Sequence, residues 1–451
     1  MTGPRPTPAM SANTPMADAT GSNRAVGATG SADAAGSARA AGRAGSIPAA
    51  GTTANTPTAE ATASTPPAGI TTAAPAAAIA ICGAGPVGMA LAAMLARRGV
   101  DGQRIVLIDA KALGAAITDP RSLALSHGSG QLLEQLGAWP LPSTPIHQIH
   151  VSRRGHFGRT LIDRAEHHVP ALGHVTRYGE LVDALARACE RAGVRTLRPL
   201  RVTALAEHAD GVTLTLDDGG TLEAGVVVQA EGGVFGEQTR QGRTRDYQQS
   251  AVIARVSVSD PIAARAFERF TDEGPLALLP QEGRDGHQYA LVWCARPDTA
   301  AELLALDDAA FLARLGQAFG TRLGRFTACG ARACYQLGLN ADARASARTV
   351  AIGNAAQTLH PVAGQGLNLG LRDAAVLARA LAKDPSPCGL AAFNADRAAD
   401  RGTTVTLTDT MARAFASRGP AQALLGLGLA AIDAVTPARG LLAELMMYGR
   451  R

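Results

Sequence analysis

One unit near the start of the apolar part of the chain constrains the fold more than any other feature. Ala76–Cys82 is an apolar run, the turn G-A-G-P-V-G follows at Gly83–Gly88, and a helical pattern covers Met89–Arg98. A second apolar run, Ile105–Ile108, ends at Asp109. Strand, G-x-G-x-x-G, helix, strand and acidic residue in this order predict a βαβ unit that binds a dinucleotide.

Each polar or glycine position of this unit has a predicted role. Gly83 makes the tight turn, Gly85 lets a pyrophosphate approach the backbone, and Gly88 lets helix and strand pack closely. Asp109 would accept a hydrogen bond from a ribose hydroxyl. The alternative for Asp109 is an ordinary surface charge at the end of a strand.

A second glycine-bearing segment lies far along the chain and reads V-A-I-G-N-A-A-Q-T-L-H-P-V-A-G-Q-G-L-N-L-G-L-R-D, from Val350 to Asp373. Val350–Ile352 is typical of a buried strand, Gly353–Gly366 must be a loop, and apolar residues from Leu367 onward recur at helical spacing. The start of such a helix suits an anion or an electron-rich ring, because free N–H groups and the positive end of the helix dipole point outward. An ordinary strand-to-helix turn is the alternative.

Composition separates the first part of the chain from the rest of its 451 residues. Residues 1–75 are mostly Ala, Thr, Gly, Ser and Pro, which predicts a disordered tail, with a transit peptide as the alternative. The net charge of +5 comes from scattered residues, nearly all Arg, and no basic stripe indicates nucleic-acid binding. The six cysteines form no C-x-x-C pair, so neither a metal site nor a disulfide is predicted. No run of about 18 apolar residues occurs, so no transmembrane helix is expected.

The middle of the chain predicts a second domain. Strand patterns there do not alternate with helices, which favours an antiparallel sheet, and a helix is predicted at Asp307–Phe319. The predicted strands are Ile146–Ser152, Gly158–Ile162, Val194–Leu197, Arg201–Glu207, Val212–Leu216, Thr221–Glu223, Val226–Gln229, Tyr247–Ser259 and His287–Cys294. The predicted fold class is α/β, a Rossmann-like nucleotide-binding domain with an inserted, mostly antiparallel β-sheet domain.

The C-terminal segment is rich in leucine and methionine and poor in charge from Ala421 to Met447. Its amphipathic pattern fits either a pair of packing helices or a face that lies on a membrane surface. Residues 419–451 are therefore predicted to be C-terminal amphipathic helices.

Three motifs together carry a family resemblance: Gly83–Gly88, D-P-R-S-L-A-L-S at Asp119–Ser126, and Gly353–Asp373. With these in view, the chain resembles the FAD-dependent aromatic hydroxylases of the para-hydroxybenzoate hydroxylase fold, and among them the monooxygenases of ubiquinone biosynthesis. Two further blocks match, H-V-S-R-R-G-H at His150–His156 and A-F-E-R-F-T-D-E-G-P-L-A-L-L-P at Ala266–Pro280.

The resemblance implies a division into domains and a reaction. The FAD-binding domain would comprise 76–145, 175–240 and 345–418, and the substrate domain 146–174 and 241–344. The cofactor would be FAD, reduced by NAD(P)H or another electron donor, with dioxygen as co-substrate. A flavin C4a-hydroperoxide would hydroxylate the ring of a polyprenylated methoxyphenol, without a metal. The expected location is cytoplasmic, with peripheral contact at the inner face of the membrane and association with other ubiquinone-biosynthesis proteins as further expectations.

The resemblance also implies the site residues. The reaction site would be lined by His360, Pro361, Gly364, Gln365 and Gly366. His360 would either handle a proton or make a structural hydrogen bond. The cofactor would be held by Gly83, Gly85, Gly88, Asp109, Arg121, Arg177, Gly353, Asn354, Gly364, Gly366, Leu367 and Asn368.

Two rival functions stay open at this point. A non-catalytic protein that binds a prenyl lipid could keep the nucleotide-binding half as architecture, and it would be colourless when purified. An FAD-dependent dehydrogenase or prenyl reductase would share the nucleotide-binding domain, but it would leave no oxygen atom from dioxygen in its product.

Overall fold

The computed structural model describes residues 77–155, 159–232, 244–281, 286–340, 346–357 and 364–397, together with residues 440, 443, 444, 447 and 448. The predicted tail, His360, Pro361 and most of the C-terminal segment lie outside these residues. The described strands form three sheets, which contain seven, eight and three strands.

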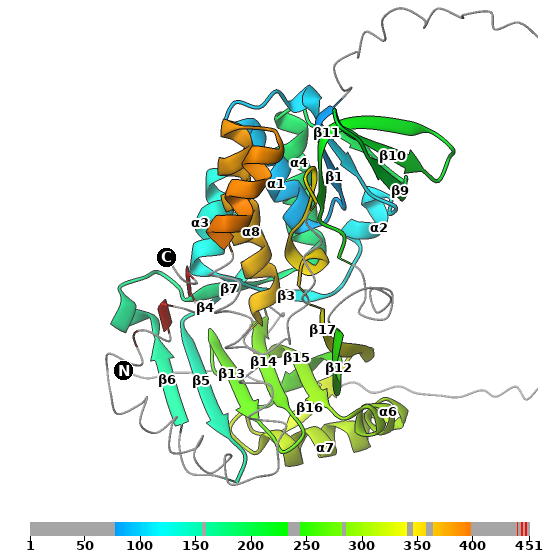
Figure 1. Ribbon diagram of the computed structural model, residues 1–451. Helices are drawn as coiled ribbons and strands as arrows, with labels where there is room; N and C mark the ends of the chain where they lie inside the picture. The colour runs from blue at the N-terminus through cyan, green and yellow to red at the C-terminus, as the bar shows by residue number, and fades with distance from the viewer. Residues whose placement is uncertain are drawn as a thin grey trace, which may run out of the picture. The chain divides into compact units, whose positions relative to one another are not determined.

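The seven-stranded sheet is built around β1 (Ala77–Cys82), which pairs in parallel with β2 (Ile105–Ile108) and β11 (Thr221–Gln229) (Figure 1). Its order is β8-β2-β1-β11-β10-β9, and β18 pairs with β11. Every residue of β1 and β2 is buried, as uninterrupted apolar strands in a parallel sheet require. The other strands of this sheet are β8 (Arg195–Leu197), β9 (Val202–Glu207), β10 (Val212–Leu216) and β18 (Thr349–Ala351).

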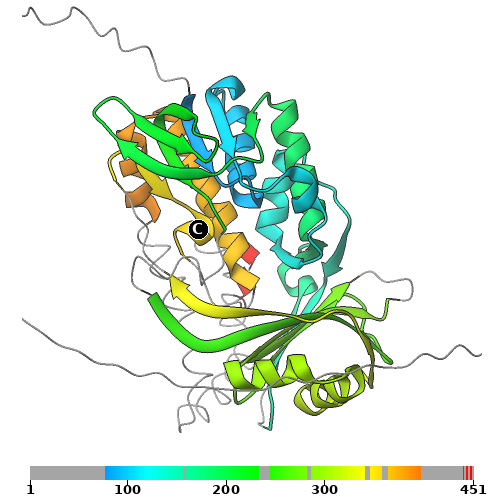
Figure 2. The same ribbon diagram turned by 90° about the vertical axis from the view of Figure 1, so that its right-hand side faces the viewer.

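Three helices complete the core of this half of the molecule: α1 (Pro86–Arg97), α4 (Tyr178–Arg191) and α8 (Gln365–Lys383). Their apolar faces join β1, β2, β11 and β18 in one buried cluster, to which Leu91, Leu185 and Leu377 belong. Figures 1 and 2 show α1 and α8 side by side on this sheet. The predicted Rossmann-like βαβ unit is therefore confirmed.

One predicted pair of strands is a single strand. Thr221–Glu223 and Val226–Gln229 are the two ends of β11, which runs through Ala224 and Gly225 without a break. The strand changes partners along its length, with β10 antiparallel to its first half and β1 parallel to it from Ala224 onward. The glycine permits the change, since a Cβ at Gly225 would lie 2.9 Å from the carbonyl oxygen of Ala78.

The eight-stranded sheet confirms the expectation of an inserted, mostly antiparallel sheet. Its order is β16-β12-β15-β14-β13-β5-β6, with β17 paired to β12, and only β5 and β13 pair in parallel among its described strands. Helices α6 (Pro297–Ala305) and α7 (Asp308–Phe319) lie on the face away from α8 (Figures 1 and 2). The strands are β5 (Gln148–Arg153), β6 (Arg159–Asp163), β12 (Thr244–Val258), β13 (Arg265–Phe270), β14 (Pro275–Gln281), β15 (Gln288–Ala295), β16 (Phe326–Cys329) and β17 (Ala333–Asn340).

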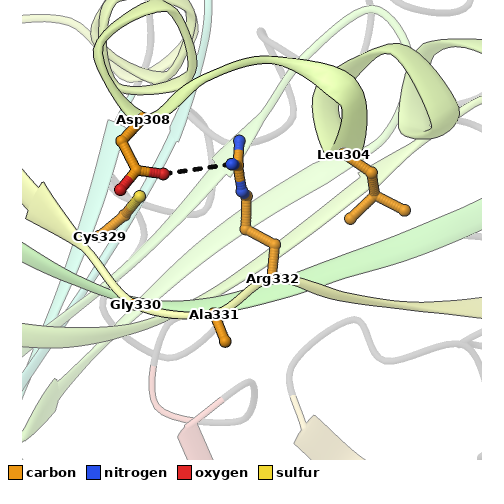
Figure 3. A pocket seen from close by; sticks show the side chains of 6 residues that line it. All are labelled: Leu304, Asp308, Cys329, Gly330, Ala331 and Arg332. Carbon is orange, nitrogen blue, oxygen red and sulfur yellow. Dashed lines mark hydrogen bonds and ion pairs between the residues drawn. The ribbon is translucent and has the colours of Figure 1, made fainter. Parts of the chain in front are cut away.

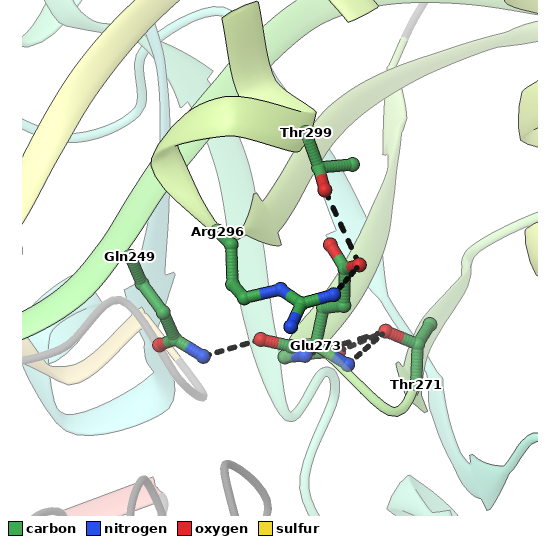
Figure 4. Close-up of polar contacts among 6 residues, drawn as sticks. Gln249, Thr271, Glu273, Arg296 and Thr299 are labelled. Atoms are coloured by element: carbon green, nitrogen blue, oxygen red, sulfur yellow. Dashed lines mark hydrogen bonds and ion pairs between the residues drawn. The ribbon is translucent and has the colours of Figure 1, made fainter. Parts of the chain in front are cut away.

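A polar cluster fixes the turn between β13 and β14 (Figure 4). The Glu273 carboxylate accepts hydrogen bonds from Arg296 at 3.0 Å and from Thr299 at 3.2 Å, at the start of α6. The side-chain amide of Gln249 donates to the backbone carbonyl of Glu273, and the backbone N–H of Glu273 donates to the Thr271 hydroxyl at 3.3 Å. The cluster thus ties the turn to both β12 and α6.

The three-stranded sheet, of order β3-β7-β4, was not expected. Its members are β3 (Ser122–Ser126), β4 (Ser143–Ile146) and β7 (Gly173–Arg177), all antiparallel. Strand β4 ends at Ile146 and β5 begins at Gln148, so the predicted strand Ile146–Ser152 is broken at His147. This sheet is joined to the eight-stranded one by contacts of β14 with β4 and β7 and by a hydrogen bond from Gln281 to Ser122.

None of the described helices combines the length and the apolar character that crossing a membrane requires.

Candidate functional site

The glycine turn after β1 is shaped by close contacts at two of its three glycines. Gly83 has a φ of +103°, and a Cβ there would lie 2.6 Å from the carbonyl carbon of Ala230. A Cβ at Gly88 would lie 2.0 Å from the carbonyl oxygen of Gly83. At Gly85 the nearest atom would be the Tyr178 hydroxyl at 3.5 Å. The turn is therefore tightly packed on the protein side and open above Gly85, which fits the approach of a pyrophosphate.

Asp109 stands at the end of β2, beside this turn. Its Oδ2 accepts a hydrogen bond from the backbone N–H of Ala84 at 2.8 Å, and its Oδ1 accepts one from Lys111 at 2.8 Å. Each carboxylate oxygen keeps a further lone pair, and the side chain is only partly buried. The geometry leaves Asp109 able to accept from a ribose hydroxyl, as predicted.

The two glycine-bearing segments meet at Val87, the second residue of α1. A Cβ at Gly353 would lie 3.4 Å from the Val87 side chain, and one at Gly370, on α8, would lie 2.7 Å from it. Small residues at these positions let α1, α8 and the turn after β18 pack together. Segments separated by more than two hundred residues thus form one surface.

Helix α8 begins two residues earlier than the apolar pattern suggested, at Gln365. Its N-cap is Gly364, which is left-handed with φ +60°, and no side chain caps this end. At Gly366, in the first turn, a Cβ would lie 3.9 Å from the Asn354 side chain, the nearest described neighbour outside the helix. Gln365 and Leu367 are half-buried beside it. The helix start therefore has no side-chain cap, and the positive end of the helix dipole lies next to a glycine with few neighbours among the described residues.

Asn368 has a different position from the one expected of a cofactor ligand. Its side chain is 2 % exposed, and its Oδ1 accepts from the Ser126 backbone at 2.9 Å and the Ser129 hydroxyl at 2.8 Å. Its Nδ2 donates to the carbonyl oxygens of Ala124 at 3.0 Å and Gly364 at 2.9 Å. All four hydrogen bonds of the amide are used within the protein. The side chain holds the start of α8 against β3 and α3 (His127–Gln135), so it is not free to bind a ligand.

Arg121 lies in the segment before β3 and is held by two neighbours. Its guanidinium makes a bidentate contact with Asp119, with Nε at 2.9 Å and Nη2 at 2.7 Å from the carboxylate oxygens. Burial opposes ionisation of Asp119, but the hydrogen bonds from Arg121 outweigh it and lower the pKa of this carboxyl group. The guanidinium also lies 4.6 Å from the ring centroid of Tyr178. Arg177, in contrast, is exposed at the N-cap of α4.

Two residues that the sequence reasoning passed over lie at the glycine turn. The Tyr178 hydroxyl lies over Gly85, and burial raises the pKa of this phenol, so it is a protonated donor at neutral pH. Arg198 donates from Nη2 to the carbonyl oxygen of Ala84, while its Nε and Nη1 are buried without a partner among the described residues. Buried donors of this kind beside a phosphate-binding turn fit an anionic ligand. Neither side chain belongs to a sequence motif that would have drawn attention to it.

A separate pocket lies on the far side of the eight-stranded sheet, where α7 begins and β16 ends (Figure 3). In it, Arg332 pairs with Asp308 at 3.1 Å, and the pKa of Cys329 is raised by burial and by the hydrogen bond that its thiol donates to the Asp308 carboxylate. It contains none of the predicted site residues. Within the described ranges, no group of three His, Cys, Asp or Glu side chains could hold a metal ion.

Comparisons with known proteins agree with this geometry. Residues 76–398 match the family model described as an FAD binding domain. Ubiquinone hydroxylase UbiL of Rhodospirillum rubrum is 36% identical over 382 residues, 80% of this chain and 87% of that protein. The 3-demethoxyubiquinol 3-hydroxylase of Escherichia coli is 32% identical over 310 residues, 65% of this chain and 77% of that protein.

Among solved structures, p-nitrophenol 4-monooxygenase PnpA of Pseudomonas putida superposes with a TM-score of 0.66 at 18% identity, covering 83% of this chain and 98% of that one. At this identity the likeness shows the fold, and it is the predicted fold of aromatic hydroxylases. The chain belongs to the family of FAD-dependent monooxygenases defined by this FAD-binding domain.

Proposed function

We propose that this protein hydroxylates the aromatic ring of a polyprenylated methoxyphenol in ubiquinone biosynthesis. The observation that carries the proposal is the packing of α1 against α8 and the turn after β18, through Val87, Gly370 and Gly353. This packing brings the two glycine-bearing segments together, which supports a single cofactor site formed by both. The relatives that are named as ubiquinone hydroxylases support the substrate class.

Different residues of the described part of the chain would bind different parts of FAD. Backbone N–H groups above Gly85 would bind the pyrophosphate, with the Tyr178 hydroxyl and Arg198 as further donors. Asp109 would bind the adenosine ribose. The N-terminus of α8 at Gly364 and Gly366 would face the isoalloxazine ring, where the helix dipole stabilises negative charge by about 1 kcal/mol.

The chemistry places few demands on the side chains. FAD, reduced by NAD(P)H or another electron donor, would supply the chemistry that transfers one oxygen atom of dioxygen to an electron-rich ring carbon while the other leaves as water. The protein must bind the substrate ring next to the isoalloxazine, orient it, and exclude water. The predicted positions of His360 and Pro361 in the lining of the reaction site are also part of the proposal. Peripheral contact with the inner face of the membrane, from the cytoplasmic side, also belongs to it.

An absorbance spectrum followed by product analysis tests the proposal. The purified protein should be yellow, and with a short-chain prenyl methoxyphenol, NAD(P)H and isotopically labelled dioxygen it should give a product that carries one labelled oxygen atom. A colourless protein would instead favour the lipid-binding alternative. A yellow protein whose product lacks the label would favour a dehydrogenase or prenyl reductase.

The variant Gly366→Val tests the cofactor surface. The new side chain has room among the described residues, because outside the helix the nearest described atom to a Cβ is 3.9 Å away, but it would fill the space in front of the helix start. We expect loss of bound FAD with the fold retained. Gly316→Val is the matched control, since Gly316 also lies in a helix, α7, and a Cβ there meets nothing within 4 Å. Equal FAD content in the two variants would remove α8 from the cofactor site.

A further inference from the structure

Five arginines gather on one face at the β6 edge of the eight-stranded sheet. The face is the one covered by α7 further along the sheet, since His150 of β5 contacts Phe267 of β13, and Phe267 packs edge-on against Phe319 of α7. Side chains two residues along a strand share a face. We call this group the arginine face; its members are Arg154, Arg159, Arg265, Arg269 and Arg322.

The contacts of these arginines within the described residues are with neutral groups. Arg322 contacts the His150 Nε2 at 2.9 Å, and Arg265 donates to the Gln148 side chain at 2.8 Å. Arg269 reaches Ser152 at 3.5 Å, while its Nε is buried and has no partner. None of the five forms an ion pair within the described ranges, although six pairs occur elsewhere in them.

The positive charges act on one another. After burial, the charges of Arg159 and Arg265 lower the pKa of Arg322, and those of Arg322 and Arg154 lower the pKa of Arg269. Among the described residues with a shifted pKa, Asp163 is the one carboxylate that interacts with a member of this group: the charge of Arg265 helps to lower its pKa. The Asp163 carboxylate also accepts a hydrogen bond from Gln148 at 2.5 Å. Among the described residues, positive charge therefore exceeds negative charge on this face, and a negatively charged partner would reduce the repulsion between the arginines.

The shape and composition of the face restrict the class of partner. A small-molecule site is concave, but the arginine face lies on open strands, and Arg154, Arg159 and Arg322 are exposed. A specific protein interface has an apolar centre, but the exposed large apolar side chains among the described residues are Leu113 and Leu304, which lie elsewhere. A cationic face with three exposed arginines and without an exposed apolar centre among the described residues matches the phosphates of anionic lipids.

We propose that the arginine face docks this protein on an anionic phospholipid surface. The proposal rests on the proposed function for its biological reason, because a polyprenyl phenol resides in a bilayer and the enzyme must meet it there. It assigns the contact to β5, β6 and β13, whereas the sequence pattern pointed only to the C-terminal segment.

Vesicle co-sedimentation of the full-length, FAD-loaded protein tests the proposal. Vesicles of phosphatidylcholine with about one third phosphatidylglycerol should retain the protein at low salt, and pure phosphatidylcholine should not. The double variant Arg159→Gln/Arg322→Gln should bind the anionic vesicles roughly 30-fold more weakly than the unaltered protein. Added salt should likewise weaken the binding of the unaltered protein to these vesicles. Melting temperature and FAD content show whether the variant is folded.

The control variant Arg97→Gln/Arg98→Gln removes the same charge from two exposed arginines at the end of α1, and should bind like the unaltered protein. Equal loss in both double variants, equal binding to neutral vesicles, or preference for DNA over vesicles would overturn the proposal. None of these three outcomes depends on the reaction, because turnover of a water-soluble methoxyphenol, measured separately, reports on the proposed function alone.

Discussion

The amide of Asn368 offers the sharpest test of how the start of α8 is positioned. The variant Asn368→Ala removes four hydrogen bonds at a side chain that is 2 % exposed, and leaves the Ser126 N–H and the carbonyl oxygens of Ala124 and Gly364 without their partner. A buried group that loses its partner costs about 1–3 kcal/mol. Allowing for partial relaxation, we expect the free energy of unfolding to fall by about 3–5 kcal/mol.

The same variant should weaken FAD binding in the molecules that remain folded. Gly364 is the N-cap of α8, and Asn368 holds its carbonyl oxygen at 2.9 Å, so without the amide the helix start is no longer fixed against β3. Urea unfolding of the FAD-free protein measures the stability, and quenching of flavin fluorescence in the absence of urea measures the affinity.

Asn394→Ala is the matched control, because Asn394 is half-buried on the helix formed by residues 387–397 and lies outside the site. It should change the free energy of unfolding by less than about 1 kcal/mol and leave the FAD affinity unaltered. A loss below about 1 kcal/mol for Asn368→Ala, or unaltered FAD affinity despite a large loss of stability, would refute the positioning role.

Three further predictions test other parts of the structure. Tyr178→Phe removes the hydroxyl that lies over Gly85, so FAD should bind about 5-fold more weakly in a fluorescence titration while the FAD-free protein melts as before; unaltered affinity would show that the hydroxyl does not reach the cofactor. Arg397 donates a hydrogen bond of 2.7 Å to Asp373, and both side chains are buried; Asp373→Asn removes the negative charge of this acceptor and should cost about 3–5 kcal/mol in urea unfolding, against less than about 1 kcal/mol if the ion pair contributes little. Burial, followed by the charges of nearby arginines, lowers the pKa of His150 to about 4, below the value near 6.5 of an unfolded chain. The unfolded state therefore takes up the proton first as the pH falls, and the free energy of unfolding should drop by on the order of 2 kcal/mol between pH 6.5 and 5. The variant His150→Gln should lack this component of the pH dependence, and an identical slope in both proteins would contradict the assignment.

The parts of the fold that the sequence predicted well are those specified by local pattern. The bounds of β2 and β10 were predicted to the residue, and those of β1 and α7 to within one residue. In each case the apolar run or the helical spacing, together with glycine or aspartate at the boundary, is contained within one short segment. Asp307, for example, caps α7 by accepting from the Ala310 N–H at 2.7 Å.

The parts that were missed depend on partners far away in the sequence. Strands β3, β4 and β7 have only four or five residues each, with serine, threonine, proline and glycine among them, and they are strands because they pair with one another. Tyr178 lies at the glycine turn because α4 starts beside it, and no spacing within its own segment indicates that. Asn368 was assigned to the cofactor by resemblance, whereas its partners Ser126 and Ala124 are about 240 residues away.

The glycines of the two motifs illustrate why residue type alone does not define a site. At Gly83, Gly88 and Gly370 an added Cβ would meet protein atoms at 2.0–2.7 Å, so these glycines are required for the fold itself. At Gly85 and Gly366 the nearest such atoms among the described residues would be 3.5 Å and 3.9 Å away, so these residues do not make glycine necessary there. The absence of a side chain at these two positions lets a ligand approach the backbone closely. They lie at the start of α1 and in the first turn of α8, the two places where a bound FAD would touch backbone.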